Sequence, residues 1–341
     1  MTAKASEVLF NSQTSVAPLG IIALEGAAEL GKMIDRYLVS WAQKGGYDID
    51  TLLIKNQCPR FASGDGKGLI ESTVRGKDIF IVVDVGNYSC TYQMFGRENY
   101  MSPDDHYQDL KRIIQAISGK AHRINVIMPI LYGGRQHKRS YRESLDCACA
   151  LQELQSMGVS NIVTFDAHDP RVHNAIPLMG FDNVIPSYQV LKALLKNVKD
   201  LVINKDEFMV VSPDEGALNR NMYYASVLGV DMGMFYKRRD YSKIVDGRNP
   251  IVAHEYLGNS MEGKDVFVAD DIISSGESVL DIAYALKAKK ARRFFAYGTY
   301  GLFTNGFEKF DKAYEDGYIS GVFGTLSLIH ISEPTRQAEI S

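Results

Sequence analysis

Two adjacent carboxylates, Asp270 and Asp271, are the residues of this chain best suited to chemistry. They follow a short apolar run at residues 266–269, which is typical of a buried parallel strand. Residues 274–278 are then small or hydroxyl-bearing with a single glycine, and apolar residues recur at helical spacing from Val279. Such a turn offers backbone N–H groups and a helix N-terminus to a phosphate. Because carboxylates would repel a bare phosphate, they suit sugar hydroxyls or Mg²⁺ beside it, and the pattern predicts a site for a phosphorylated sugar.

Further polar residues follow other apolar segments that we expect to be strands. Ligands of open α/β sheets bind outside the carboxyl ends of the strands, so these residues are candidates for the same kind of site. Their types suit a nucleoside triphosphate, Mg²⁺ and a sugar phosphate, because phosphoryl-type transfer needs mainly positioning and charge neutralisation. The candidates are Arg135, Gln136 and His137 after residues 124–129, His168 after 161–165, Asp214 after 209–211, and Lys237 and Arg239 after 232–236.

Each candidate also has a plainer interpretation. The acidic pair could end an ordinary strand of an α/β protein, and the basic loops could be solvated surface. His168 could be structural, and Asp214 could cap the next helix. The joint occurrence of these residues at comparable strand ends favours a binding site over separate explanations.

The elements that must position these residues alternate along the chain, which predicts an α/β fold with mainly parallel sheets, about five strands in each half. Residues 86–101 are rich in Tyr, Asn and Gly and are expected to form a loop, and Ser102 is expected to cap the helix that follows. Two domains are predicted, at residues 1–185 and 186–325. Strands are expected at 19–23, 78–85, 124–129, 161–165, 209–211, 232–236, 266–269 and 294–298, and helices at 25–41, 103–117, 144–157, 190–197 and up to 228.

Composition narrows the class of protein. A length of 341 residues suits two domains, and a net charge of −3 gives no reason to expect a nucleic-acid or membrane partner. No apolar run approaches the roughly 20 residues of a membrane helix, and the N-terminal segment lacks the pattern of a signal peptide. The four cysteines show no metal-binding spacing, so we expect reduced thiols and a cytoplasmic location.

The segment at residues 326–341, LSLIHISEPTRQAEIS, resembles the in-frame translation of a transposase-type sequencing adaptor. We therefore expect the native sequence to end near Thr325 and residues 326–341 to be a non-native tail. A natural polar tail is the alternative. The segment is set aside in predicting the fold.

The motifs together resemble one family. The segments RINVIMPILYGGRQHKR, NIVTFDAHD, VVSPDEGALNR, MFYKRRD and VADDIISSGES are similar, in this order, to segments of the ribose-phosphate pyrophosphokinases, the synthetases of phosphoribosyl pyrophosphate (PRPP). The chain resembles a divergent bacterial-type member. This resemblance implies two tandem phosphoribosyltransferase-like domains and the transfer of the β,γ-diphosphoryl group of ATP to ribose 5-phosphate, with Mg²⁺ as cofactor and PRPP and AMP as products. It also implies a homo-oligomer, commonly a hexamer, in which a neighbour's ATP site borrows residues 61–67.

The resemblance also assigns roles to residues. It implies ATP binding by Arg135, Gln136, Phe61, Ser63 and Asp65, ribose 5-phosphate binding by Asp270, Asp271, Ser274, Ser275, Gly276 and Ser278, Mg²⁺ binding by His168 and Asp214, and catalysis by Lys237 and Arg239.

The chain departs from the family pattern at several of these positions. His137, Ser63 and Ser274 stand where the family usually has Asp, and Asp65 stands for a Glu. Residues 86–101 look like an insertion. Two alternatives therefore stay open: a phosphoribosyltransferase, which consumes PRPP and needs only one such domain, and a non-catalytic regulatory subunit related to the synthetases.

Overall fold

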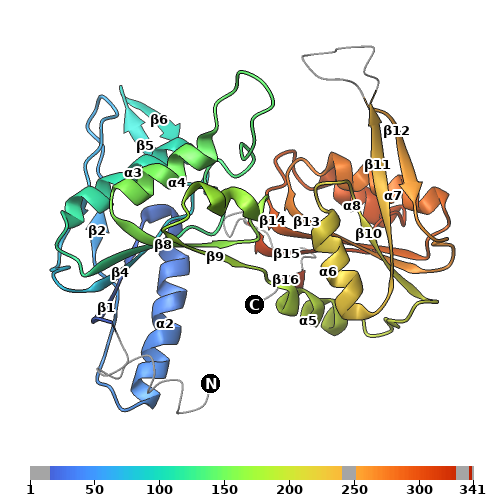
Figure 1. Cartoon of the computed structure of the whole chain (residues 1–341), viewed down its shortest axis with the longest axis horizontal. Coiled ribbons are helices and arrows are strands. Elements are labelled where there is room, and N and C mark those ends of the chain that lie inside the picture. Colours follow the sequence, from blue (N-terminus) through green and yellow to red (C-terminus); the bar gives the residue numbers. More distant parts are fainter. Residues whose placement is uncertain (1–15, 240–250, 328–337, 340–341) are drawn as a thin grey trace. The chain divides into compact units, whose positions relative to one another are not determined.

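The computed structural model describes residues 16–239, 251–327 and 338–339 (Figure 1). The chain divides into two compact units, Met1–Ile185 and Pro186–Ser341. Each unit is built around its own sheet, so each is described by itself. The alternation of strands and helices predicted from the sequence is confirmed in both units.

Unit 1 contains a five-stranded sheet in the order β1-β4-β7-β8-β9, and every neighbouring pair is parallel. Successive side chains along β4 point to opposite faces of the sheet, as in any β-strand. Ile79 and Ile81 pack with α3 and α4, whereas Val82 packs with α2 on the other face. The bounds are β1 Leu19–Ala23, β4 Asp78–Val82, β7 Arg123–Ile127, β8 Val159–Phe165, β9 Gly180–Val184, α2 Ala28–Lys44, α3 Pro103–Ile117 and α4 Asp146–Ser156, with short helices η1 Glu25–Ala27 and η2 Pro170–Ala175.

The start of α3 follows from its sequence. The Ser102 hydroxyl accepts a hydrogen bond from the Asp105 backbone, and the Asp105 side chain accepts one from the Ser102 backbone. These two bonds satisfy groups that would be unpaired at a helix end, and Pro103 occupies the first helical position, where it needs no N–H partner. The predicted helix start is confirmed.

The prediction of a loop over residues 86–101 is wrong. This segment contains a β-hairpin, β5 Thr91–Met94 and β6 Arg97–Tyr100, which forms a two-stranded sheet of its own. Phe95 and Gly96 form its turn with φ angles of +51° and +72°, the combination that two-residue hairpin turns require. Because phenylalanine rarely adopts a positive φ, the dipeptide gave no turn signal of the Asn-Gly kind. A second small sheet pairs β2 Asn56–Gln57 with β3 Leu69–Ile70.

Unit 2 contains a seven-stranded sheet in the order β12-β11-β10-β13-β14-β15-β16, more than the expected five or so. Only the β11–β12 pair of these described strands is antiparallel. Helices α5 and α6 pack on one face and α7 and α8 on the other. The bounds are β10 Phe208–Ser212, β11 Asp231–Arg239, β12 Ile251–Leu257, β13 Asp265–Ile273, β14 Arg293–Gly301, β15 Gly321–Ser327, β16 Ala338–Glu339, α5 Ser187–Asn197, α6 Leu218–Leu228, α7 Glu277–Ala288 and α8 Glu308–Glu315.

The structure also bears on membrane-spanning helices, on the cysteines and on the C-terminal segment. None of the described helices is long and apolar enough to span a membrane. The four cysteines, Cys58, Cys90, Cys147 and Cys149, all lie among the described residues, and none of them forms a disulfide. Of the segment 326–341, residues 328–337 and 340–341 lie outside the described residues, so the proposed adaptor origin stays a prediction.

Candidate active site

The acidic pair lies at the carboxyl end of the central strand β13. The sequence places Asp270 and Asp271 after the strand, but pairing with β14 continues through Ile273, so the pair lies inside it. Asp271 is almost fully buried, whereas about a third of the Asp270 side chain is exposed. Burial, and next the Asp271 carboxylate, raise the pKa of Asp270 well above its usual range. Two carboxylates held this close favour a cation or hydroxyl donors as ligands.

Helix α6 supports the acidic pair through two neighbouring side chains. The Arg220 guanidinium lies 3.7 Å from Asp270 Oδ1 and 4.0 Å from Asp271 Oδ1, so it neutralises part of their charge. The fully buried Asn221 donates to the backbone oxygen of Ala269 at 2.8 Å and accepts from the Ala269 N–H at 3.0 Å. Asn221 thus fixes the backbone of β13 directly before the acids.

The turn after β13 presents a helix N-terminus. Gly276 is the N-cap residue of α7 with a φ of +83° and offers no side-chain cap, and the Ser275 hydroxyl accepts a hydrogen bond from the Glu277 N–H at 3.5 Å. A Cβ on Gly276 would lie 2.2 Å from Cε2 of Phe310, so both conformation and space require glycine. The N–H groups of the first turn of α7 can therefore receive an anion, with Ser274, Ser275 and Ser278 beside them.

Asp214 lies in the turn between β10 and α6. Its Oδ1 accepts hydrogen bonds from the N–H groups of Gly216 and Ala217, at 2.9 and 3.2 Å. The plainer interpretation, a turn that leads into the helix, therefore holds for this oxygen. The negative charge of Asp214 also contributes to the raised pKa of Asp270, so the three carboxylates share one electrostatic environment.

The basic residues Lys237 and Arg239 lie near the carboxyl end of β11, at the same edge of the sheet as the acidic pair. Lys237 and Arg239 belong to β11 and pair with His254 and Ile251 of β12, so the predicted strand end at 236 is wrong: β11 continues through both residues. The antiparallel pairing with β12 extends β11, and this pairing was not predicted from the sequence. The side chains of Lys237 and Arg239 lie outside the described residues.

In unit 1 the structure brings together side chains from two strand-end loops. His137 follows β7 and His168 follows β8, and their ring centroids lie 5.1 Å apart in an edge-on arrangement. His137 Nε2 is 3.6 Å from Asp169 Oδ2. Burial, and next the neighbouring His168, lower the pKa of His137 although Asp169 opposes this, so the His137 imidazole is neutral near pH 7. Hydrogen bonds from Arg171 lower the pKa of Asp169 to about 2 and keep it charged.

The neighbouring Arg135 and Gln136 are placed differently. Arg135 is exposed. The Gln136 side-chain amide donates to the Ser144 backbone oxygen at 2.8 Å, so it braces the loop that carries both residues.

The segment around Phe61 forms a compact turn. The Phe61 N–H donates to the Asp65 backbone oxygen, and the Ser63 hydroxyl donates to the Asp65 carboxylate at 2.8 Å. The Phe61 ring is more than half exposed, and Lys67 Nζ lies 5.9 Å from its centroid. An exposed aromatic face beside a cation suits a nucleobase and its phosphates.

Sequence reasoning missed Arg220, Asn221 and Asp169. A signal existed for Asn221, because it occupies a core-facing position of α6 with Tyr224 and Ala225, three and four residues further on. A polar residue in such a stripe indicates a buried hydrogen bond. Arg220 and Asp169 carry no comparable signal, because the acidic pair that Arg220 meets on β13 and the His137 that Asp169 meets after β7 are distant along the chain.

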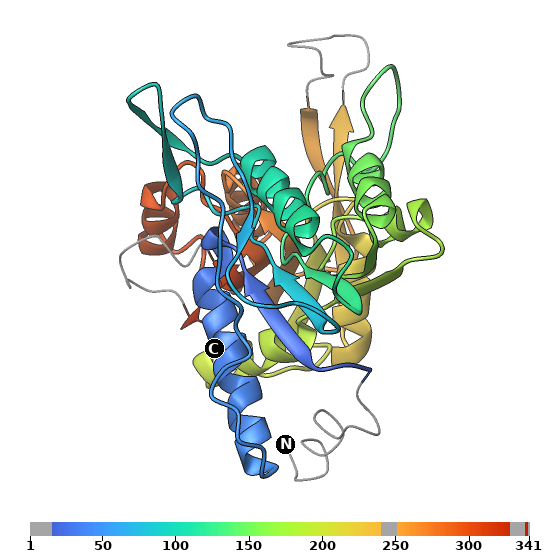
Figure 2. The ribbon, with the colours of Figure 1, turned by 90° about the vertical axis from the view of Figure 1, so that its left-hand side faces the viewer.

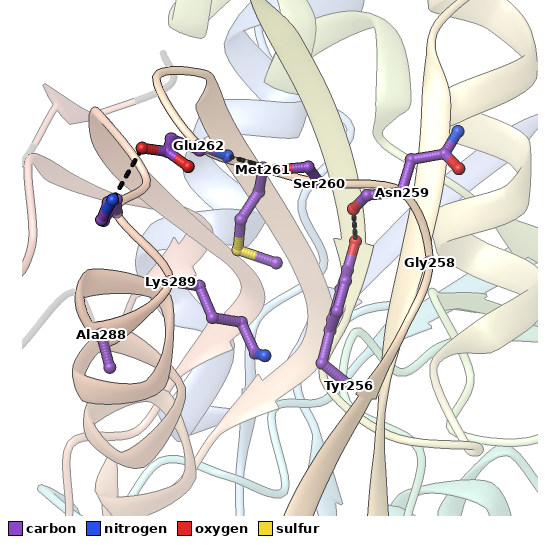
Figure 3. A pocket seen from close by; sticks show the side chains of 9 residues that line it. Tyr256, Gly258, Asn259, Ser260, Met261, Glu262, Ala288 and Lys289 are labelled. Atoms are coloured by element: carbon purple, nitrogen blue, oxygen red, sulfur yellow. Dashed lines mark hydrogen bonds and ion pairs between the residues drawn. The ribbon is translucent and has the colours of Figure 1, made fainter.

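The cavity in Figure 3 lies elsewhere in unit 2. It has a volume of about 340 Å³ and is lined by residues 256, 258–262 and 288–290, which lie at the end of β12, before β13 and at the end of α7. Lys289 lies over the Tyr256 ring, 5.2 Å from the centroid, and Lys290 pairs with Glu262 at 2.9 Å. Because β13 separates this cavity from the acidic pair, it is not the predicted site.

Two family models match the chain. The N-terminal domain of ribose phosphate pyrophosphokinase matches residues 19–158, and the phosphoribosyl transferase domain matches residues 182–300. The first model covers the strand-end loops of unit 1 up to α4, and the second covers the acidic pair and the turn before α7.

Curated relatives and a solved structure agree with these matches. The chain is 27% identical over 250 residues to a ribose-phosphate pyrophosphokinase of Ralstonia nicotianae, covering 72% of this chain and 70% of that protein. It is 29% identical over 249 residues to the protein of that name from Haemophilus ducreyi, with the same coverage. The crystal structure of phosphoribosylpyrophosphate synthetase from Mycobacterium smegmatis matches 94% of this chain and 93% of its own, with a TM-score of 0.73 and 18% identity. That match shows the same fold, including both phosphoribosyltransferase-type units.

Proposed function

Because the chain belongs to the ribose-phosphate pyrophosphokinase family, we propose that it transfers the β,γ-diphosphoryl group of ATP to the C1 hydroxyl of ribose 5-phosphate, giving PRPP and AMP. In this reaction the C1 oxygen attacks the β-phosphorus, the bond from the β-phosphorus to the α,β-bridging oxygen breaks, and the hydroxyl proton is released. Family membership makes the protein a transferase of the kinase type that acts in nucleotide biosynthesis.

The observation that carries this proposal is the arrangement of side chains and backbone N–H groups at the carboxyl end of β13. An acidic pair precedes the N-terminus of α7, whose N-cap residue is the glycine Gly276, and ribose 5-phosphate presents hydroxyls and a phosphate together. Asp270 and Asp271 accept hydrogen bonds from the sugar hydroxyls, while Ser274, Ser275, Gly276 and Ser278 hold the phosphate with the first turn of α7. Fixing both ends of the sugar orients its C1 hydroxyl for attack.

The ATP side is assigned to unit 1. Phe61 stacks on the base, Ser63 and Asp65 shape the turn around it, and Arg135 and Gln136 contact the nucleotide. Lys237 and Arg239 of unit 2 neutralise charge on the migrating diphosphoryl group. The exposed Phe61 ring and the exposed Arg135 support these assignments.

Mg²⁺ fits the described residues as a cofactor with few protein ligands. Among the part of the chain that the structure describes, no three His, Cys, Asp or Glu side chains gather as a closed metal site. Mg²⁺ usually keeps waters and phosphate oxygens and takes one or two carboxylates, which the shared charge of Asp214 and Asp270 can supply. We assign His168 in unit 1 and Asp214 in unit 2, each taken by itself, as Mg²⁺ ligands. When bound, the ion would withdraw charge from the triphosphate.

Two other functions make different demands on the chain. A phosphoribosyltransferase uses the Asp270–Ser278 segment but gives no role to Arg135, His168 or Lys237. A non-catalytic regulatory subunit accounts for the substitutions Ser63, His137 and Ser274.

We also propose a homo-oligomer in the cytoplasm, where ATP and ribose 5-phosphate occur and where four free thiols persist.

The deciding experiment measures AMP release from ATP by the full chain with Mg²⁺, with and without ribose 5-phosphate. We expect AMP and PRPP in equal amounts only when both substrates are present. AMP release without ribose 5-phosphate would indicate an unrelated hydrolase. No AMP, together with pyrophosphate release from PRPP and a free base, would identify a phosphoribosyltransferase; no turnover in either assay would leave the regulatory subunit.

A further inference from the structure

The turn at residues 60–66 is anchored at its base by helix α3. Arg60 forms a two-pronged ion pair with Asp109, at 2.7 and 2.8 Å, and Arg112 contacts the same carboxylate at 2.7 Å. The Arg60 and Asp109 side chains are buried. Arg60 and Gly66 also form an antiparallel bridge that closes the turn. These contacts fix where the turn begins and ends.

The tip of the turn is covered by the β5–β6 hairpin. The Phe95 N–H donates to the backbone oxygen of Ala62 at 2.8 Å. Met94 lies against Gly64, because a Cβ added to Gly64 would be 2.6 Å from Met94 Sδ. Tyr92 lies under the base, with the Arg60 guanidinium 5.2 Å from its ring centroid. In Figures 1 and 2 the blue turn and the cyan hairpin project side by side from unit 1.

The base of the hairpin is held in place by several hydrogen bonds. At its base the Met101 N–H donates to the Cys90 oxygen at 2.8 Å. The nearly inaccessible Asn87 donates to the Gly26 oxygen at 2.8 Å, and its own backbone oxygen bonds His106. At its tip Phe95 is 78% exposed and adopts a φ of +51°, a conformation that disfavours phenylalanine by roughly 1 kcal/mol or more. The hydrogen bonds at the base fix the hairpin to unit 1, and the backbone of its tip lies over the turn at residues 60–66.

We propose that the β5–β6 hairpin is a clamp that positions the nucleotide-binding turn at residues 61–65. The inference rests on the proposed function only in identifying ATP as the ligand of this turn. If the turn at residues 61–65 were anchored only at its base, Phe61 would sample several conformations. ATP would then have to order the turn on binding. The clamp removes that entropic cost before the nucleotide arrives. Met94 is accordingly a positioning residue, which acts through Gly64 and does not touch the substrate.

The first test replaces Met94 with alanine, which removes the contact with Gly64 and leaves the hairpin backbone intact. We expect M94A to raise KM for ATP about five- to tenfold, with kcat and KM for ribose 5-phosphate within about twofold of wild type, because tenfold corresponds to about 1.4 kcal/mol of lost preorganisation. The matched control is F95N, which keeps the N–H donor and places a residue that tolerates positive φ at the tip. It should leave both KM values unchanged.

A second readout does not depend on turnover. Hydrogen exchange at the Phe61 and Gly64 amides, which are bonded within the turn, should accelerate at least fivefold in M94A and stay as in wild type in F95N. If the protein makes no PRPP, the proposed function fails, while this measurement still decides whether the hairpin clamps the turn. Unchanged exchange in M94A would overturn the clamp whatever the enzyme does.

A third variant replaces residues 91–100 by two glycines, which the Cys90–Met101 hydrogen bond makes geometrically feasible. If it keeps the circular dichroism of wild type, KM for ATP should rise more than in M94A while KM for ribose 5-phosphate holds. A parallel rise of both KM values would overturn the proposal, because the hairpin would then support unit 1 as a whole. An F95N variant as weak for ATP as M94A would also overturn it, because the tip ring would then contact the nucleotide directly.

Discussion

The two units hold their functional residues in different ways. In unit 2 the acids and the phosphate turn belong to one continuous segment, from Asp270 to Ser278, that follows a single strand. In unit 1 the corresponding residues come from three separate places: the turn at Phe61, the loop after β7 and the turn after β8. A continuous site keeps its geometry as long as its own spacing is kept. A composite site depends on strand order. Departures from the family pattern fall in both kinds of site, at His137, Ser63 and Asp65 in unit 1 and at Ser274 in unit 2.

The two units also handle charge differently. Unit 2 concentrates negative charge at Asp270 and Asp271 and balances part of it with Arg220. Unit 1 places the imidazoles of His137 and His168 together and pairs His137 with Asp169, which hydrogen bonds from Arg171 keep charged. A site that is charged before its ligand binds suits a sugar and a cation, whereas a neutral imidazole suits metal coordination or an acceptor role. Each of the following experiments tests one side of this contrast.

The largest effect is expected from Lys237→Ala. If the continuous segment only binds and Lys237 neutralises the migrating phosphates, kcat should fall about 10²- to 10³-fold while ATP binding changes little. Steady-state AMP release and calorimetric ATP binding measure the two quantities. Lys312→Ala, an exposed position on α8, is the control and should behave as wild type. Unchanged turnover in K237A would remove Lys237 from the mechanism.

Gly276→Ala tests the continuous segment itself. The new Cβ meets Phe310 and requires a positive φ, so the turn must shift, and we expect KM for ribose 5-phosphate to rise tenfold or more while KM for ATP holds. Gly306→Ala is the matched control, because Gly306 also has a positive φ, of +75°, but no atom lies within 4 Å of the added Cβ. Equal effects of the two substitutions would show that backbone strain alone, away from the site, explains the loss.

Asn221→Ala tests how far unit 2 depends on tertiary support. Its removal leaves the N–H and C=O of Ala269 without their side-chain partner in a buried place, so the free energy of unfolding should fall by about 1–3 kcal/mol. Urea denaturation gives this value. The exposed Asn219→Ala on the same helix should stay within about 0.5 kcal/mol of wild type. A similarly small change in N221A would mean that the segment needs no support from α6.

The smallest effect concerns pH. The pKa of Asp270 is raised in the folded protein, so the folded state keeps the proton on Asp270 to higher pH than the unfolded chain does. In the unfolded chain aspartates titrate at about 4. Within this window the folded state binds more protons, so the free energy of unfolding contributed by Asp270 declines as pH rises. Denaturation curves across the window should show a flatter pH dependence in D270N than in wild type. D311N, at an exposed position on α8, should keep the wild-type slope, and equal slopes in D270N and wild type would contradict the assignment.

The sequence by itself determined the features that depend on neighbours along the chain. Strand and helix periodicity predicted the α/β alternation, and the spacing from Asp270 to Ser278 predicted an acidic pair before a helix N-terminus. The start of α3 at Ser102 was equally readable. Each of these depends on residues within a turn or two of one another, where backbone geometry fixes which groups can meet.

Only the tertiary structure decided which distant residues meet. His137 lies beside His168 and Asp169 because β7 and β8 are neighbouring parallel strands, and Asn221 reaches Ala269 because α6 packs over β13. The hairpin over residues 91–100 and its contact with Gly64 were hidden because a Phe-Gly turn carries no usual turn signal and its partner lies some thirty residues earlier. Local propensity does not encode the order in which strands are laid down, and this order brings the separate loops of unit 1 together.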